Sequence, residues 1–271
     1  MHWFVTDETN NDSVSGTFFI YGGLVVTDAQ LREIHTALEA IRSKYGYLPG
    51  DSLKFHTRSR PAQVSIPDSK AAKREVIEAL ERIGARLIIY VILHDIANSQ
   101  TADTRQKWAL NTVTYAYYRL LSEENAGGVF LMDRDDDQHT HLASLFQTGP
   151  QMADGRHIAV SDRIFLFGMT ANNSSHLSSA VDIALGGFRY CVNTAGGDGA
   201  QVVAGEIFPP LARMLWGREV GGTKYIRDRG FHSMPKTEIK SYSYKRIYKN
   251  LFEKLNDYSG GDADTPEEGQ P

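Results

Sequence analysis

The order in which strand-like and helix-like segments alternate constrains the fold of this chain more than any single motif. Residues 2–8 and 17–26 are rich in aromatic and β-branched side chains, and the polar segment between them predicts a hairpin. Apolar runs predict further strands at 86–94, 128–133 and 162–169. Helical periodicity predicts helices at 29–46, 69–84, 104–124, 138–147 and 176–192. This order is typical of an α/β domain with a mixed sheet.

The same order indicates how the chain divides. If residues 28–84, beginning with Asp28 as a helix N-cap, form a helical insertion after the second strand, the remaining elements follow the ribonuclease H order. We therefore expect an α/β, ribonuclease H-like fold over residues 1–195, with a mixed five-stranded sheet flanked by helices. A C-terminal extension is expected over 196–257, packed on that domain. The acidic, Gly- and Pro-rich residues 258–271 predict a disordered tail.

Composition and charge narrow the class of protein. The formal net charge of -4 means that binding of a polyanion would require a local concentration of basic residues. The single cysteine, Cys191, excludes an internal disulfide framework and a cysteine-rich zinc site, and is typical of a reducing cytosol. We recognise no signal peptide, and no apolar stretch approaches the roughly 18 residues that span a bilayer. A cytoplasmic protein without a membrane partner is expected.

Three aspartates fall at positions that the expected topology would bring together. Asp7 and Asp133 end the first and fourth strands, and Asp182 lies on the last core helix. In the ribonuclease H topology these two strands are central neighbours, so both carboxylates would emerge at one edge, facing Asp182. Taken singly, an aspartate at a strand end is more often a turn or cap residue. The small residues around Asp182 would serve close helix packing equally well.

Clustered carboxylates repel one another unless a cation neutralises them. Hard oxygen ligands suit Mg²⁺ or Mn²⁺, which also bind phosphate oxygens. Such ions can activate water and stabilise the leaving oxygen in phosphoryl displacement. The sequence therefore predicts a catalytic metal site formed by Asp7, Asp133 and Asp182.

Short motifs in the same order resemble a known family. The chain has FVTDE at 4–8, FFIYGGLVV at 18–26, SLKF at 52–55, LMD at 131–133 and SAVDIALGG at 179–187. In this order the segments are similar to the bacterial proteins grouped as domain of unknown function 3800, which are regarded as ribonuclease H-like. The resemblance covers roughly residues 2–195. It implies a nuclease-like activity with the three aspartates at its centre.

Two positions depart from the family pattern and bear on substrate binding. Ser52 stands where the family has glutamate, and Ser179 stands where it has glutamine. Lys54 matches the family and is a candidate phosphate contact. Glu8 matches the second acidic residue of the first motif, although on a strand its side chain would point away from Asp7. The candidate substrate-binding residues are thus Glu8, Lys54, Ser179 and Arg189.

Two other polar segments admit more than one interpretation. The run at 133–141 offers Asp135 and His139 as further metal ligands, but an acidic loop that caps the next helix is the simpler interpretation, and an EF-hand is excluded by the missing glycine and glutamate. The segment 218–254 interleaves basic residues with tyrosines. It would suit phosphate contacts and base stacking, or equally a solvated helix whose tyrosines pack on the domain.

Three functions follow as hypotheses. The first is an Mg²⁺- or Mn²⁺-dependent nuclease, which makes RNA or DNA the expected partner. The second is a non-catalytic nucleic-acid or protein-binding module that retains the fold, suggested by Ser52 and Ser179. The third is hydrolysis of a small phosphoester. The sequence leaves the oligomeric state open.

Overall fold

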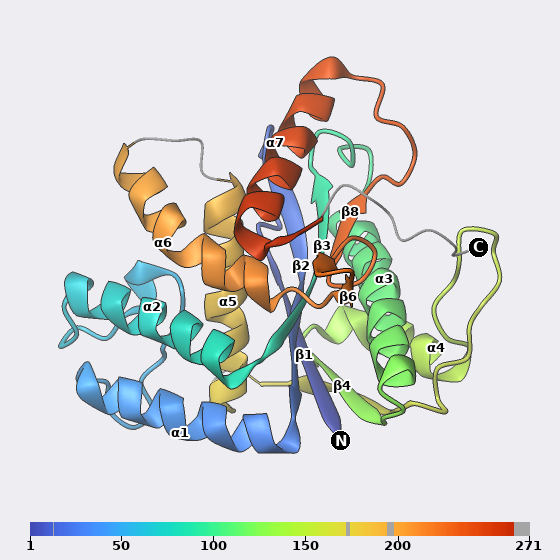
Figure 1. Ribbon diagram of the computed structural model, residues 1–271. Helices are drawn as coiled ribbons and strands as arrows, with labels where there is room; N and C mark the ends of the chain where they lie inside the picture. The colour runs from blue at the N-terminus through green and yellow to red at the C-terminus, as the bar shows by residue number, and fades with distance from the viewer. Residues whose placement is uncertain (13, 172–173, 194–197, 263–271) are drawn as a thin grey trace.

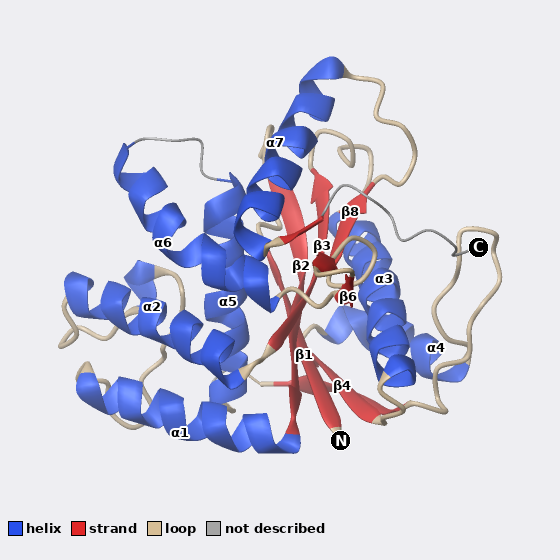
Figure 2. Ribbon diagram, viewed as in Figure 1, coloured by secondary structure: helices blue, strands red, loops and turns tan. Residues whose placement is uncertain are grey.

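A mixed sheet forms the centre of the molecule (Figures 1 and 2). The computed structural model describes residues 1–12, 14–171, 174–193 and 198–262. Among these residues, six strands follow the order β5-β4-β1-β2-β3-β8. The strands are β1 (His2–Thr9), β2 (Phe18–Thr27), β3 (Arg86–Leu93), β4 (Gly128–Asp133), β5 (Ile164–Thr170) and β8 (Phe231–Met234). β6 (Arg218–Val220), β7 (Thr223–Tyr225) and β9 (Gly261–Asp262) form a separate small sheet.

The strand directions combine a hairpin with parallel crossovers. β1 and β2 are antiparallel, as the sequence predicted, and β2 is antiparallel to β3. β4 runs parallel to β1 on its other side, and β5 runs parallel to β4. The register pairs Thr6 with Met132, so Asp7 and Asp133 come next on their strands at the same edge of the sheet. This adjacency of β1 and β4 is the feature that positions the site.

The expectation of a five-stranded sheet is wrong, because a sixth strand comes from the C-terminal extension. β8 pairs parallel to β3 at the edge of the sheet. Its buried Phe231 joins the core, and Nε2 of the buried His232 lies 2.7 Å from the carbonyl of Arg229. The four residues of β8 show no alternation of apolar and polar side chains, because both faces are covered. The extension therefore completes the sheet as well as packing on the domain.

Helices cover both faces of the sheet (Figure 1). One core includes apolar residues of α1, α2, α5, α6 and α7, and the other includes those of α3 and α4. Alternation along β1 sends Val5 into the first core and Phe4 into the second. The helices are α1 (Asp28–Lys44), α2 (Ile66–Ile83), α3 (Ala102–Glu123), α4 (His139–Gln147), α5 (His176–Asn193), α6 (Asp198–Met214) and α7 (Tyr242–Ser259), with short 3₁₀ turns η1 (Thr57–Ser59) and η2 (Asp136–Gln138).

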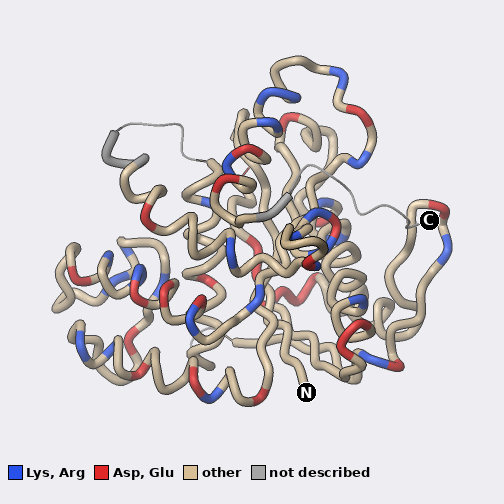
Figure 3. The backbone as a smooth tube through the Cα atoms, in the orientation of Figure 1, with Lys and Arg blue, Asp and Glu red and all other residues tan. Residues whose placement is uncertain are grey.

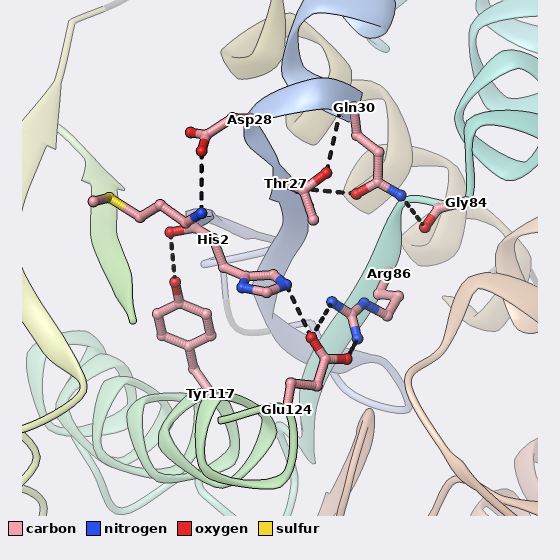
Figure 4. Close-up of polar contacts among 9 residues, drawn as sticks. His2, Thr27, Asp28, Gln30, Gly84, Arg86, Tyr117 and Glu124 are labelled. Atoms are coloured by element: carbon pink, nitrogen blue, oxygen red, sulfur yellow. Dashed lines mark hydrogen bonds and ion pairs between the residues drawn. The ribbon is translucent and has the colours of Figure 1, made fainter. Parts of the chain in front are cut away.

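The insertion begins with a capped helix whose N-cap is one residue earlier than expected. Thr27, not Asp28, caps α1 through a reciprocal pair of hydrogen bonds with Gln30. Asp28 instead accepts hydrogen bonds from the amino terminus at 3.0 Å and from Nε1 of Trp3 at 2.8 Å. The polar network at the start of β1 joins the amino terminus to Asp28 and Thr27 to Gln30 in Figure 4. It fixes the end of β1 opposite to Asp7.

The structure describes only part of the expected C-terminal extension and tail. The boundary at 195 lies outside the described residues. α7 continues to Ser259 and β9 pairs with β7, so ordered structure extends past residue 258, where the tail was expected to begin. Residues 263–271 of that tail lie outside the described residues. No helix in the described part of the chain is long and apolar enough to cross a membrane.

Candidate functional site

The three predicted aspartates line one small pocket at the end of β1 and β4. Its cavity volume is about 20 Å³, which is room for roughly one water-sized body. Asp7 comes from β1, Asp133 from β4 and Asp182 from α5, which packs across both β1 and β2. The full lining comprises Val5, Thr6, Asp7, Lys54, Asp133, Thr170, Ser178, Ser179, Val181 and Asp182. The fold thus brings together carboxylates that lie far apart in the sequence.

Asp182 is tied to the insertion by a hydrogen bond from the backbone. The N–H of Phe55 donates to Oδ2 of Asp182 at 2.6 Å. The ring of Phe55 lies against α5 where Gly186 offers no side chain; a Cβ at Gly186 would lie only 2.5 Å from Phe55 Cβ. The glycine pair of the SAVDIALGG segment therefore makes room for the residue that orients Asp182. This contact fixes segment 52–57 beside the pocket.

Burial and neighbouring charge make the pocket unfavourable for ionised carboxylates. Burial raises the pKa of Asp7 to about 8, helped by the negative charges of Glu8, Asp133 and Asp182. The backbone N–H of Glu8 donates to Oδ1 of Asp7 at 2.8 Å and offsets only part of this effect. Burial also raises the pKa of Asp182, opposed by its bond from Phe55. Negative charge in this pocket is therefore under-compensated by the chain itself.

The oxygen atoms that line the pocket suit a hard divalent cation, but the carboxylates are not already grouped around a metal position. Among the described residues, no three His, Cys, Asp or Glu side chains are grouped closely enough to hold a metal ion. The pocket nevertheless supplies three carboxylates and the hydroxyls of Thr170, Ser178 and Ser179. A cation would relieve the repulsion that raises the pKa of Asp7. Binding would require the three carboxylates to come closer together.

The predicted substrate-binding residues divide into two sets. Lys54 and Ser179 line the pocket, and the positive charge of Lys54 favours ionised Asp182. Glu8 and Arg189 do not line it. Burial raises the pKa of Glu8, and the negative charges of Asp135 and Asp133 raise it further. Arg189 instead lines a groove between α2 and α5.

The sequence interpretation missed Thr170 and Lys73, and counted Ser178 only among the small residues around Asp182. Thr170 pairs with Asp133 in the register of β5 and β4, so its position at a strand end was a usable signal. Ser178 lies one turn before Asp182 on α5. Lys73 is buried on α2 and donates to the carbonyl of Phe55 at 2.9 Å and to Oγ1 of Thr57 at 3.1 Å. Nothing in the sequence indicates these contacts of Lys73.

The acidic loop after β4 has local structural roles. Asp135 caps η2 by accepting from the N–H of Asp137 at 3.1 Å. Arg134 binds Asp136 at 3.0 Å, and Nε2 of His139 lies 3.5 Å from Asp136. Neither Asp135 nor His139 lines the carboxylate pocket. These contacts favour the capping interpretation over further metal ligands.

Many cations of the C-terminal segment 218–254 bind groups of the protein itself. Figure 3 shows basic and acidic positions interspersed in this region. The buried Arg229 binds Glu123 at 2.7 Å, and Tyr248 is buried against the core. Further contacts join Lys224 to the carbonyl of Arg213, Lys236 to Asp228, Lys245 to Glu238 and Lys249 to Glu253. These contacts favour packing over a nucleic-acid interface.

Comparison with protein-family models, with curated proteins and with solved structures finds no match for this chain. The functional conclusion therefore rests on the geometry of the pocket.

Proposed function

We propose that this chain is an Mg²⁺- or Mn²⁺-dependent phosphodiesterase that hydrolyses nucleic acid. The observation that carries the proposal is the convergence of Asp7, Asp133 and Asp182 on one pocket, with a raised pKa at two of them. The central adjacency of β1 and β4 supports a ribonuclease H-like core. The resemblance to the domain of unknown function 3800 family remains part of this proposal.

The side chains of the pocket have distinct roles in the proposed reaction. Asp7, Asp133 and Asp182 would hold the divalent cation, which supplies an activated water and stabilises the leaving oxygen. Lys54 would attract a substrate phosphate to the same pocket. The hydroxyls of Ser178 and Ser179 offer hydrogen bonds to phosphate oxygens. Phe55 would keep the Asp182 carboxylate oriented through its backbone N–H.

The proposal is tested by incubating the full chain with labelled RNA and DNA in Mn²⁺. Cleavage that is abolished by Asp7→Asn and by Asp182→Asn supports it, because each change removes a ligand charge while preserving side-chain size. A panel of nucleotides in the same assay tests hydrolysis of a small phosphoester. Absence of metal-dependent cleavage by wild-type protein on every substrate would refute the proposal.

A second candidate is a binding module that retains this fold without catalysis. It is favoured by the absence of a closely grouped metal cluster among the described residues. Ser179 in the pocket lining, where the family has glutamine, points the same way. A mobility shift of nucleic acid without cleavage would identify this function.

A further inference from the structure

A groove between α2 and α5 adjoins the carboxylate pocket along the chain. Lys54 lines the pocket, while the next residues, Phe55, His56 and Thr57, line the groove. The cavity volume of this α2–α5 groove is about 790 Å³, within the range of ligand-binding sites. On α5, Asp182 of the pocket and Arg189 of the groove are two turns apart and share one face of the helix.

Positive charge in the α2–α5 groove exceeds negative charge, although the whole chain is acidic. Arg58, Lys70, Lys73 and Arg189 line the groove with Arg74. Among the described residues of the lining, the one acidic side chain is Glu206, which Arg74 binds at 3.0 Å. Burial and the charge of Lys70 lower the pKa of Lys73 to about 8. This crowding of like charges favours an anionic ligand.

Arg189 carries a second indication of a ligand. Its Nε is buried and has no hydrogen-bond partner among the described residues. A buried donor without an acceptor is costly, and such groups in folded proteins ordinarily find a partner. The ion pairs among described residues do not include Arg58, Lys70 or Arg189. A phosphate oxygen would satisfy this donor and bring the negative charge that the groove lacks.

The groove also contains aromatic rings beside the cations. The rings of Phe55 and Tyr190 lie 6.2 Å apart between centroids, and both line the groove. Apolar contacts from Ile77 and Ile207 extend this surface. Aromatic faces stack on unpaired bases, whereas a duplex keeps its bases inside. The exposed cations Arg58 and Lys70 beside partly buried aromatic rings suit an extended single strand better than a rigid duplex.

We infer that the α2–α5 groove binds single-stranded nucleic acid, with one base against Tyr190 and the backbone on Arg58, Lys70 and Arg189. This inference deepens the proposed function, on which it rests, by naming the substrate class. The strand would continue past Phe55 to Lys54, which delivers the next phosphate to the carboxylate pocket.

A larger cavity between α1 and the start of α5 is a poorer candidate. Its volume is about 1080 Å³, and it borders the pocket through Ser179. Its positive charge is balanced within the lining by Glu39 and Asp51, and Arg42 donates to the carbonyls of Leu48 and Asp51 at 2.8 Å each. His176 binds Glu39 in the same lining. We therefore assign single-stranded nucleic acid to the α2–α5 groove and not to this cavity.

The test measures binding in EDTA, so that it does not depend on cleavage. Fluorescence anisotropy of a labelled single-stranded oligonucleotide, as DNA and as RNA, is compared with that of the matching duplex. We expect tighter binding of the single strand, and Arg58→Glu with Lys70→Glu to weaken it about tenfold or more. Both side chains are exposed, so the double variant should fold. Arg189→Met provides an independent second variant, expected to weaken binding severalfold.

A matched control carries the same change of charge elsewhere. Lys240→Glu with Arg246→Glu alters two exposed cations of the C-terminal segment and should leave the affinity within about twofold. If both groove variants bind the single strand like wild type, or if the duplex binds more tightly, the inference is overturned. If the groove variants lose binding but wild type cleaves nothing in Mn²⁺, the nuclease proposal fails and the groove assignment stands.

Discussion

Two regions of this molecule are rich in charged side chains, and they use charge in opposite ways. In the carboxylate pocket and the adjoining α2–α5 groove, like charges are gathered and left under-compensated: burial and its acidic neighbours raise the pKa of Asp7, and burial with Lys70 lowers that of Lys73. In the C-terminal segment 218–254, cations such as Arg229 and Lys245 lie against carboxylates. The first arrangement costs stability, whereas in the second each buried cation has a partner whose loss would leave its charge uncompensated.

This difference teaches that the number of basic residues in a sequence is a poor guide to a binding surface. The C-terminal segment has the more conspicuous run of cations. Arg58, Lys70 and Arg189 of the groove come from three separate elements, so no local run of basic residues in the sequence indicates the groove. What identifies a site is the absence of compensation after folding, which depends on tertiary neighbours.

The largest expected effect is a loss of cleavage without a loss of binding when a carboxylate of the pocket is changed. Asp182→Asn should lower the rate of Mn²⁺-dependent cleavage by about a thousandfold, because it removes one of three ligand charges at the reacting phosphate. Binding of single-stranded nucleic acid in EDTA should remain within a fewfold of wild type, because the groove is intact. Rapid-quench cleavage assays and anisotropy on the same preparations measure both quantities.

The control for this variant is Asp136→Asn, which changes an exposed aspartate that binds Arg134 outside the pocket. Cleavage by that protein should match wild type. Equal losses in the two variants would show that the effect is not specific to the pocket.

A smaller loss of catalytic rate is expected from substitution of Lys73, which holds the segment that orients Asp182. Lys73→Met removes the bonds to Phe55 and Thr57, and with them the support for the N–H that orients Asp182. We expect kcat to fall about 10- to 100-fold, as is usual when a group behind a metal ligand is lost. Lys70→Met, on the same helix but exposed, should instead raise KM through the groove. Steady-state kinetics that show the two variants to be alike would contradict this division of roles.

The sequence predicted the positions that topology alone determines. Asp133 ends β4 as expected, whereas β1 continues two residues past Asp7 to Thr9, and β1 and β4 are neighbours as expected. The sequence also contains the signal for the N-cap at Thr27, since Thr27 and Gln30 form a capping-box pattern. These features depend on short-range periodicity, which a sequence displays directly.

The rest depends on contacts between segments distant in the chain. β8 has four residues without alternation, and its strand partner β3 precedes it by several helices. Lys73 resembles any lysine on a solvated helix until the path of segment 52–57 places the carbonyl of Phe55 beside it. No spacing rule links these positions, so the groove and the support of Asp182 emerge only from the folded chain.

A prediction about pH tests whether charge in the pocket is costly. The pKa of Asp7 rises from an ordinary value near 4 to about 8 on folding, so between these pH values the folded chain holds a proton that the unfolded chain has lost. Stability from this group is therefore present below pH 4 and is lost as the pH rises toward 8. In EDTA at pH 8, Asp7→Asn should raise the free energy of unfolding by about 2 kcal/mol, part of the full linkage value.

Urea unfolding of wild type and Asp7→Asn, measured in EDTA across this range, provides the check. The two curves should converge near pH 4 and separate as the pH increases. Added Mn²⁺ should stabilise wild type more than the variant. A variant that is less stable than wild type at pH 8 in EDTA would show that the carboxylate is already compensated.

The smallest expected effect comes from the opposite region and has the opposite sign. Arg229 is buried, binds Glu123 at 2.7 Å and lies 5.2 Å from the centre of the Trp216 ring. Arg229→Met should lower the free energy of unfolding by about 1–2 kcal/mol; the figure stays below that of a fully buried pair because Glu123 is partly exposed. The affinity of the folded variant for single-stranded nucleic acid should not change.

Lys240→Met is the matched control, because it removes an exposed cation of the same segment and should leave unfolding unaltered. The comparison between the two regions depends on the sign of the change in the free energy of unfolding. Removal of the Asp7 charge should stabilise the chain, whereas removal of the Arg229 charge should destabilise it. If Arg229→Met instead preserved stability and weakened binding of the single strand, the C-terminal segment would belong to the nucleic-acid interface. The contrast between compensated and uncompensated charge would then no longer distinguish structure from function in this protein.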